Sequence, residues 1–199
     1  MTSTLQVQNL RGPTSGSNTN QVLLGSGQKI VATDQGSLVA PGTVLQVKHF
    51  QLLTPQTETY GTTNTDMPIT NFNVDITPQS TSSIIKLEAN MTFEWANAAW
   101  DTMWFFYRDS TALKATGFGS RRAGVSPSII SYHTDNSSTL EFATFTYFDT
   151  PFSTSQITYK VGVISAGTAN LFINGSINQA NAIAFDRGVS VFSAMEIAG

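Results

Sequence analysis

The sequence contains no cysteine, which excludes disulfide bonds and thiolate metal sites. It contains only two histidines, His49 and His133, which are far apart and lack the spacing of metal ligands. We therefore expect neither a metal nor another cofactor in this protein.

Charge is also scarce. Charged residues make up 12% of the chain, about half of the ~25% that is usual in globular proteins. The net charge of −3 argues against binding to nucleic acid, which needs a concentrated basic face. Arg121 and Arg122 form the single basic doublet. We interpret this doublet as a solvated turn or a local partner for Asp or Glu in preference to a phosphate site.

Long apolar runs are missing as well. No apolar segment follows Met1, and none approaches the ~18–20 residues that a membrane span requires. We therefore expect neither a signal peptide nor membrane insertion.

The clearest pattern that is present runs from residue 84 to residue 95. From Ile85 to Trp95, apolar and polar residues alternate strictly. Successive side chains of a strand point to opposite faces, so this pattern predicts a long strand with one dry and one polar face.

Similar segments follow one another through residues 44–199, separated by turn residues and by prolines at their boundaries. About nine short strands predict an all-β domain, an antiparallel β-sandwich of jelly-roll type. The predicted strands are 44–53, 69–76, 83–95, 102–109, 125–132, 139–148, 157–165, 169–174 and 189–198.

Residues 1–43 differ from this domain. They contain short apolar runs, including a small predicted strand over 28–33, between polar and glycine-rich stretches. These runs are too sparse to bury a core of their own. The segment is either disordered or paired with copies of itself, and its strand-like spacing favours pairing.

Aromatic residues cluster around the 96–101 loop, which Trp95, Trp100 and Trp104 bracket. Alternation places Trp104 and Phe106 on one face of the next strand and Phe105 on the other. Three interpretations stay open for these side chains: core packing, contact with another subunit, or stacking against a sugar ring.

Catalytic patterns are weak. The acidic residues are scattered, so no pair of carboxylates is indicated for sugar hydrolysis. His133 lies near Asp135, but no serine occupies a nucleophile elbow. We therefore expect a protein that is not an enzyme.

Several short segments occur in an order that is typical of one group of proteins, and together they extend over nearly the whole chain. These segments are residues 3–7, 25–31, 44–47, 76–83 leading into 84–95, 106–109, 147–151, 158–161 and the terminal 195–199. In these segments the chain resembles tail-fibre and related appendage proteins of tailed phages, especially those of marine and cyanobacterial hosts.

The resemblance implies a homotrimer on the virion surface, on the tail or the capsid. Residues 1–43 would attach it to other virion proteins and form the trimer, and the sandwich of residues 44–199 would face a host glycan or protein. The interface candidates are Leu5, Val7, Val22, Leu24, Ile30, Trp104 and Phe106. The ligand-contact candidates in exposed loops are Trp100, Arg121, Arg122, His133 and Asp135.

The leading hypothesis is thus a non-catalytic tail fibre, spike or receptor-binding appendage. Alternatives are a capsid-decorating (head fibre) or tail-adaptor protein without a receptor role, a polysaccharide depolymerase, and a soluble lectin. We expect the exposed ends of the domain, with variable sequence, to be the loops 96–101, 117–124, 133–138 and 178–188.

Overall fold

A computed structural model describes residues 10–17, 19, 21–31, 38–96, 101–116, 119–128 and 138–199. The chain divides into two units, Met1–Ser37 and Leu38–Gly199, where the sequence predicts segments 1–43 and 44–199. The predictions for Leu5, Val7, Trp100, His133 and Asp135 lie outside the described residues.

The second unit is built from strands, and its described residues contain no helix. The strands are β1 (Val44–Leu52), β2 (Gln56–Tyr60), β3 (Met67–Ile76), β4 (Ile84–Trp95), β5 (Met103–Arg108), β6 (Thr111–Leu113), β7 (Ser126–Pro127), β8 (Glu141–Asp149), β9 (Ile157–Ile164), β10 (Ala169–Ile173) and β11 (Ser190–Ile197).

Every predicted strand of this unit has a counterpart among the described residues, although the one predicted over 125–132 is reduced there to β7. Two strands were not predicted. β2 is polar apart from Tyr60, and β6 has only three residues, so neither carries an alternating pattern. Both exist because a neighbouring strand supplies their hydrogen bonds: β10 pairs with β2, and β5 pairs with β6.

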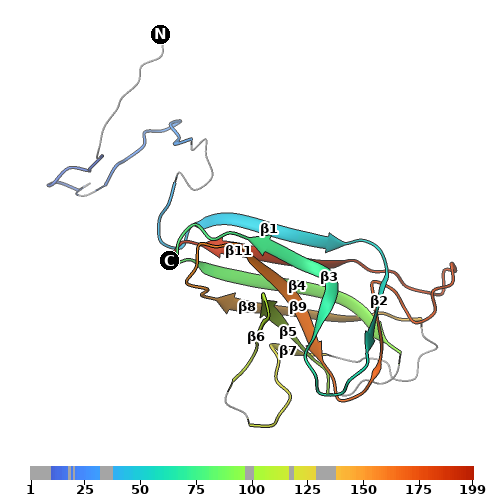
Figure 1. The fold of residues 1–199 in the computed structure, drawn as a ribbon. Coiled ribbons are helices and arrows are strands. Elements are labelled where there is room, and N and C mark those ends of the chain that lie inside the picture. The colour runs from blue at the N-terminus through green and yellow to red at the C-terminus, as the bar shows by residue number, and fades with distance from the viewer. Residues whose placement is uncertain are drawn as a thin grey trace. The chain divides into compact units, whose positions relative to one another are not determined.

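The strands form two antiparallel sheets that lie face to face (Figure 1). Sheet A runs β1-β11-β4-β8, with β10 and β2 continuing the rows of β11 and β1. Sheet B runs β3-β9-β5, with β6 and β7 sharing the next row. The chain crosses between the sheets after most strands, as in the double Greek key of a jelly roll. The predicted fold class is therefore confirmed.

The core lies between the sheets, and β4 shows why. Its apolar residues from Ile85 to Trp95 are all at most 5% exposed, as the alternation predicts. Glu94 departs from the pattern because it is buried on the outer side of the sheet, where its Oε2 accepts a hydrogen bond from the Ile177 amide at 2.6 Å.

β5 is apolar on both faces, as predicted, and both faces pack against residues of this same chain. Trp104 and Phe106 face sheet A and are completely buried in the core of this single chain. Phe105 packs on the other face against Tyr107, with ring centroids 5.1 Å apart. Trp104 and Phe106 therefore cannot form a trimer interface, and that prediction is corrected because core packing already occupies both side chains.

The strand register places two sets of loops at opposite ends of the sandwich. Val44, where β1 begins, pairs with Ile197, which in turn pairs with Ile84. At the other end, Met103 pairs with both Ile164 and Pro127. The end where the chain enters β1 is thus remote from the loop that precedes β5 and from the segment that leads into β7.

In the first unit, the described residues of 10–31 form no strand, so the strand predicted over 28–33 is absent from its described part. Their large apolar side chains are between 48% and 67% exposed. The expectation that this segment has no core of its own holds for these residues, which are Leu10, Val22, Leu23, Leu24, Ile30 and Val31.

Candidate functional site

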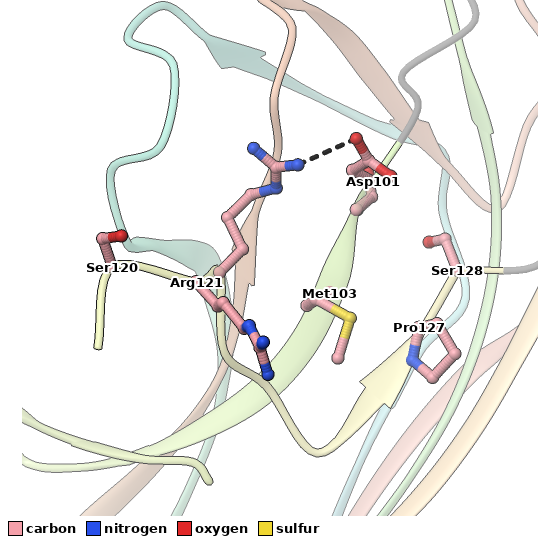
Figure 2. Close-up of a pocket in the computed structure, with 8 residues that line it drawn as sticks. Asp101, Met103, Ser120, Arg121, Pro127 and Ser128 are labelled. Atoms are coloured by element: carbon pink, nitrogen blue, oxygen red, sulfur yellow. Dashed lines mark hydrogen bonds and ion pairs between the residues drawn. The ribbon is translucent and has the colours of Figure 1, made fainter. Parts of the chain in front are cut away.

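A pocket of about 490 Å³ opens at the end of the sandwich remote from Val44, and its size is in the range of small-ligand sites. We call it the first pocket. Figure 2 shows Ser120 and Arg121 on one side of it, Pro127 and Ser128 on the other, and Met103 between them. Asp101, Thr102 and Arg122 complete its lining.

The segment before β7 forms one wall because it packs tightly along β5. The amide of Val125 donates to the carbonyl of Trp104 at 2.7 Å. A Cβ on Gly124 would lie 2.7 Å from both the Cβ of Met103 and the Trp104 carbonyl oxygen, so only glycine allows this approach. The contact fixes the chain just after the two arginines.

Arg122 is held by two partners from different loops. Its Nη2 donates to Oδ2 of Asp101 at 2.8 Å, and its Nη1 donates to Oδ1 of Asn64 at 2.8 Å. The prediction that the basic doublet pairs with an acid is confirmed for this arginine, although the acid lies in another loop instead of nearby in the sequence. Asp101 is exposed, so water screens the pair and we expect it to orient the guanidinium more than to stabilise the fold.

Arg121 differs from its neighbour. It is exposed and has no ion pair or hydrogen bond among the described residues. Its guanidinium therefore carries a positive charge at the mouth of the first pocket that no described carboxylate neutralises.

Ser128 is held in place by the core. Its Oγ accepts a hydrogen bond from Nε1 of the buried Trp104 at 2.7 Å, and its amide donates to the carbonyl of Thr102 at 2.9 Å. Because the hydroxyl acts as acceptor toward Trp104, its own proton is available to a ligand.

Two further pockets continue from the first. The second, of about 530 Å³, shares Ser120 and Arg121 with it and is also lined by Asp66 and Lys114. The third, of about 170 Å³, shares Thr65 and Asp66 with the second. The three pockets thus follow one another across the end of the sandwich.

Electrostatics in this row are nearly balanced. Lys114 donates from Nζ to Oδ2 of Asp66, and its ammonium lies 5.1 Å from the centre of the Phe105 ring. Burial raises the pKa of nearby Tyr107 to about 12, with smaller contributions from Asp66 and Tyr60. The tyrosine stays protonated at neutral pH, so it adds no charge.

Polar and charged side chains make up most of the lining of the first pocket. Among the described residues, no three or more His, Asp or Glu side chains are grouped to hold a metal. The described part of the chain likewise contains no helix that is long and apolar enough to cross a membrane. The lining offers hydrogen-bond donors, acceptors and one unpaired cation.

Of the predicted ligand contacts, the structure brings Arg121 and Arg122 into one pocket. Loop 178–188 is exposed but lies elsewhere, and the amide of Asp186 donates to the Ser138 carbonyl at 3.1 Å. Sequence reasoning missed Asn64 and Ser128 as site residues, whereas Ser120 lies in the predicted exposed loop 117–124. The positions of Asn64 and Ser128 depend on strand pairing, and no local motif marks them.

No family model and no curated protein sequence matches the chain. Similar solved structures include several from infectious bursal disease virus. The VP2 subviral particle has 12% identity and a TM-score of 0.35, with 94% of this chain and 46% of that chain covered.

Two strains of the same virus give similar values. For the Gt strain the identity is 12% and the TM-score 0.35, with 88% and 44% of the two chains covered. For the Gx strain they are 13% and 0.33, with 88% and 42% covered. This chain therefore spans less than half the length of each viral chain, and the jelly roll described above follows from its own strand order.

Proposed function

We propose that the protein is a structural protein of a virus particle, namely a homotrimeric tail fibre or spike of a tailed phage. In this proposal, the pocket-bearing end of the sandwich recognises the host cell surface without catalysis. The observation that carries the proposal is the placement of the first pocket at the end opposite to Val44, where the chain enters the sandwich.

This arrangement suits an appendage for a simple reason. A chain that is attached to a particle through its N-terminal segment presents the opposite end of the following domain outward. The first segment supports attachment because its described apolar side chains are exposed and need a partner to cover them. Trimerisation then adds avidity, since three weak sites engage one surface together.

Particles that lack the protein provide the first test. We expect deletion of its gene to abolish adsorption to the host and a cryo-EM map of the particle to place the sandwich on the outside. The variant Ser120→Trp, which fills the first pocket, should reduce adsorption. Ser110→Trp, at the exposed turn after β5, is the matched control and should leave adsorption unchanged.

A second candidate is a capsid-decorating or tail-adaptor protein with no receptor role. The strand order favours it as well, because double-sheet jelly rolls are a common architecture of viral capsid domains. Under this reading, deletion of the gene leaves adsorption intact, and both tryptophan variants behave as the parent protein does.

A further inference from the structure

We infer that the three pockets form one groove that binds an acidic oligosaccharide, and that Arg121 pairs with its carboxylate. The inference rests on the proposed function, because it names the ligand class for the same end of the sandwich.

Continuity is the first argument. The first and second pockets share Ser120 and Arg121, and the second and third share Thr65 and Asp66. A single compact ligand needs only one such pocket. Three pockets in a row that share lining residues match an oligomeric ligand, with one sugar unit in each pocket.

Charge is the second argument. Among the residues that line the first two pockets, two are acidic and three are basic. Both acids are engaged, Asp101 with Arg122 and Asp66 with Lys114. The remaining cation is Arg121, which lies on the wall between the two pockets. A guanidinium in this position favours a planar carboxylate, which it binds through two parallel hydrogen bonds.

The remaining polar groups are suited to hydroxyl groups, which both donate and accept. Ser128 keeps its hydroxyl proton, and Asn64 keeps its amide protons because only its oxygen is bound by Arg122. Asp101 is exposed and uses Oδ2 toward Arg122, so its Oδ1 is available as an acceptor. The wall of the groove therefore offers both donors and acceptors to a ligand.

A peptide or a nucleic acid fits these observations less well. An extended peptide binds by adding a strand to an exposed sheet edge, whereas the walls of this groove come mainly from loops. A nucleic acid requires several unpaired cations along its path, and here there is one.

The test uses the full-length protein labelled with ¹⁵N and three probes: tetragalacturonic acid, the uncharged galactotetraose, and a hexaglutamate peptide. We expect tetragalacturonic acid to shift the amide signals of Ser120, Arg121 and Ser128. We expect galactotetraose to bind about 10- to 100-fold more weakly, since a charge-assisted hydrogen bond is lost.

Two variants with the same change in charge separate the site from a general effect of charge. Arg121→Gln should weaken tetragalacturonic acid by about 10- to 100-fold and leave galactotetraose unchanged. Lys48→Gln, on an exposed position of β1, should change neither affinity. Raising the salt concentration should weaken the acidic probe in the parent protein and much less in Arg121→Gln.

Equal binding of the acidic and neutral probes, binding that survives Arg121→Gln, or absence of binding to both sugars would overturn the inference. Tighter binding of hexaglutamate would assign the groove to a peptide and would overturn it as well. None of these results contradicts the proposed role in host recognition. That role is contradicted by a separate result, namely normal adsorption of particles that carry Ser120→Trp.

Discussion

The hydroxyl of Tyr159 donates to Oδ2 of Asp149 at 2.7 Å and so joins the two sheets at the end where the chain enters the sandwich. Asp149 ends β8 in sheet A, whereas Tyr159 lies on β9 in sheet B. Arg108 donates to both carboxylate oxygens of Asp149, at 3.0 and 3.2 Å. Burial and the hydrogen bond from Tyr159 to Asp149 both raise the pKa of Tyr159.

We expect Asp149→Ala to lower the free energy of unfolding by about 2–4 kcal/mol. The substitution leaves a partly buried guanidinium and a buried phenol without their acceptor, which costs more than the interaction itself contributes. Urea denaturation followed by fluorescence measures the change. Asp186→Ala, at an exposed loop position, serves as the control and should change stability by less than about 0.5 kcal/mol.

Glu196 provides a second buried carboxylate near the same end. It is fully buried on β11 and accepts hydrogen bonds from the Gln79 amide, Ser83 Oγ and Gln46 Nε2, each at 2.6 Å. We expect Glu196→Ala to cost about 3 kcal/mol of unfolding free energy, because three donors lose their acceptor. Glu88→Ala, at a half-exposed position on β4, is the matched control. Equal stability losses in the two variants would contradict this account.

A third buried carboxylate, Glu94, shows where sequence reasoning stops. The alternation from Ile85 to Trp95 predicts which residues face the core because the pattern is local. The same pattern assigns Glu94 to a solvated face, but the backbone around Ile177 covers it after the chain returns from a distant segment. Burial of this kind depends on tertiary contacts, so no window of sequence contains it.

The site divides in the same way. The basic doublet and its loop are visible in the sequence, and the structure places both arginines in one pocket. The partners of Arg122 are Asn64 and Asp101, which come from two other loops. The jelly-roll strand order brings these loops together, and composition gives no sign of it.

Tyr107 should make stability depend on alkaline pH. Its pKa is raised to about 12 in the folded chain, above the ordinary value of about 10 that it regains on unfolding. The unfolded state therefore releases this proton first. Stability is fully present below pH 10 and falls by about 1 kcal/mol per pH unit from this residue between pH 10 and 12.

Urea denaturation at pH 8, 10 and 11 measures this dependence. Tyr107→Phe removes the titrating group, so we expect its loss of stability between pH 10 and 11 to be smaller than that of the parent protein. Tyr147→Phe, at a half-buried position on β8, is the control variant. An identical pH profile for Tyr107→Phe and the parent protein would contradict the prediction.

The exposed apolar side chains of residues 10–31 predict how the chain assembles. We expect light scattering to give a trimer for the full-length protein and a monomer after deletion of residues 1–37, because the deletion removes the surface that needs a partner. The double variant Leu24→Asp and Ile30→Asp should also be monomeric, since a charge buried at an interface is costly.

The control carries Thr14→Asp and Lys29→Asp in the same segment and should remain trimeric. Circular dichroism should show the same β-sheet signal in all of these proteins. A trimer that persists without residues 1–37 would move the interface to the sandwich, where Phe142 and Phe148 are exposed on the outer face of β8.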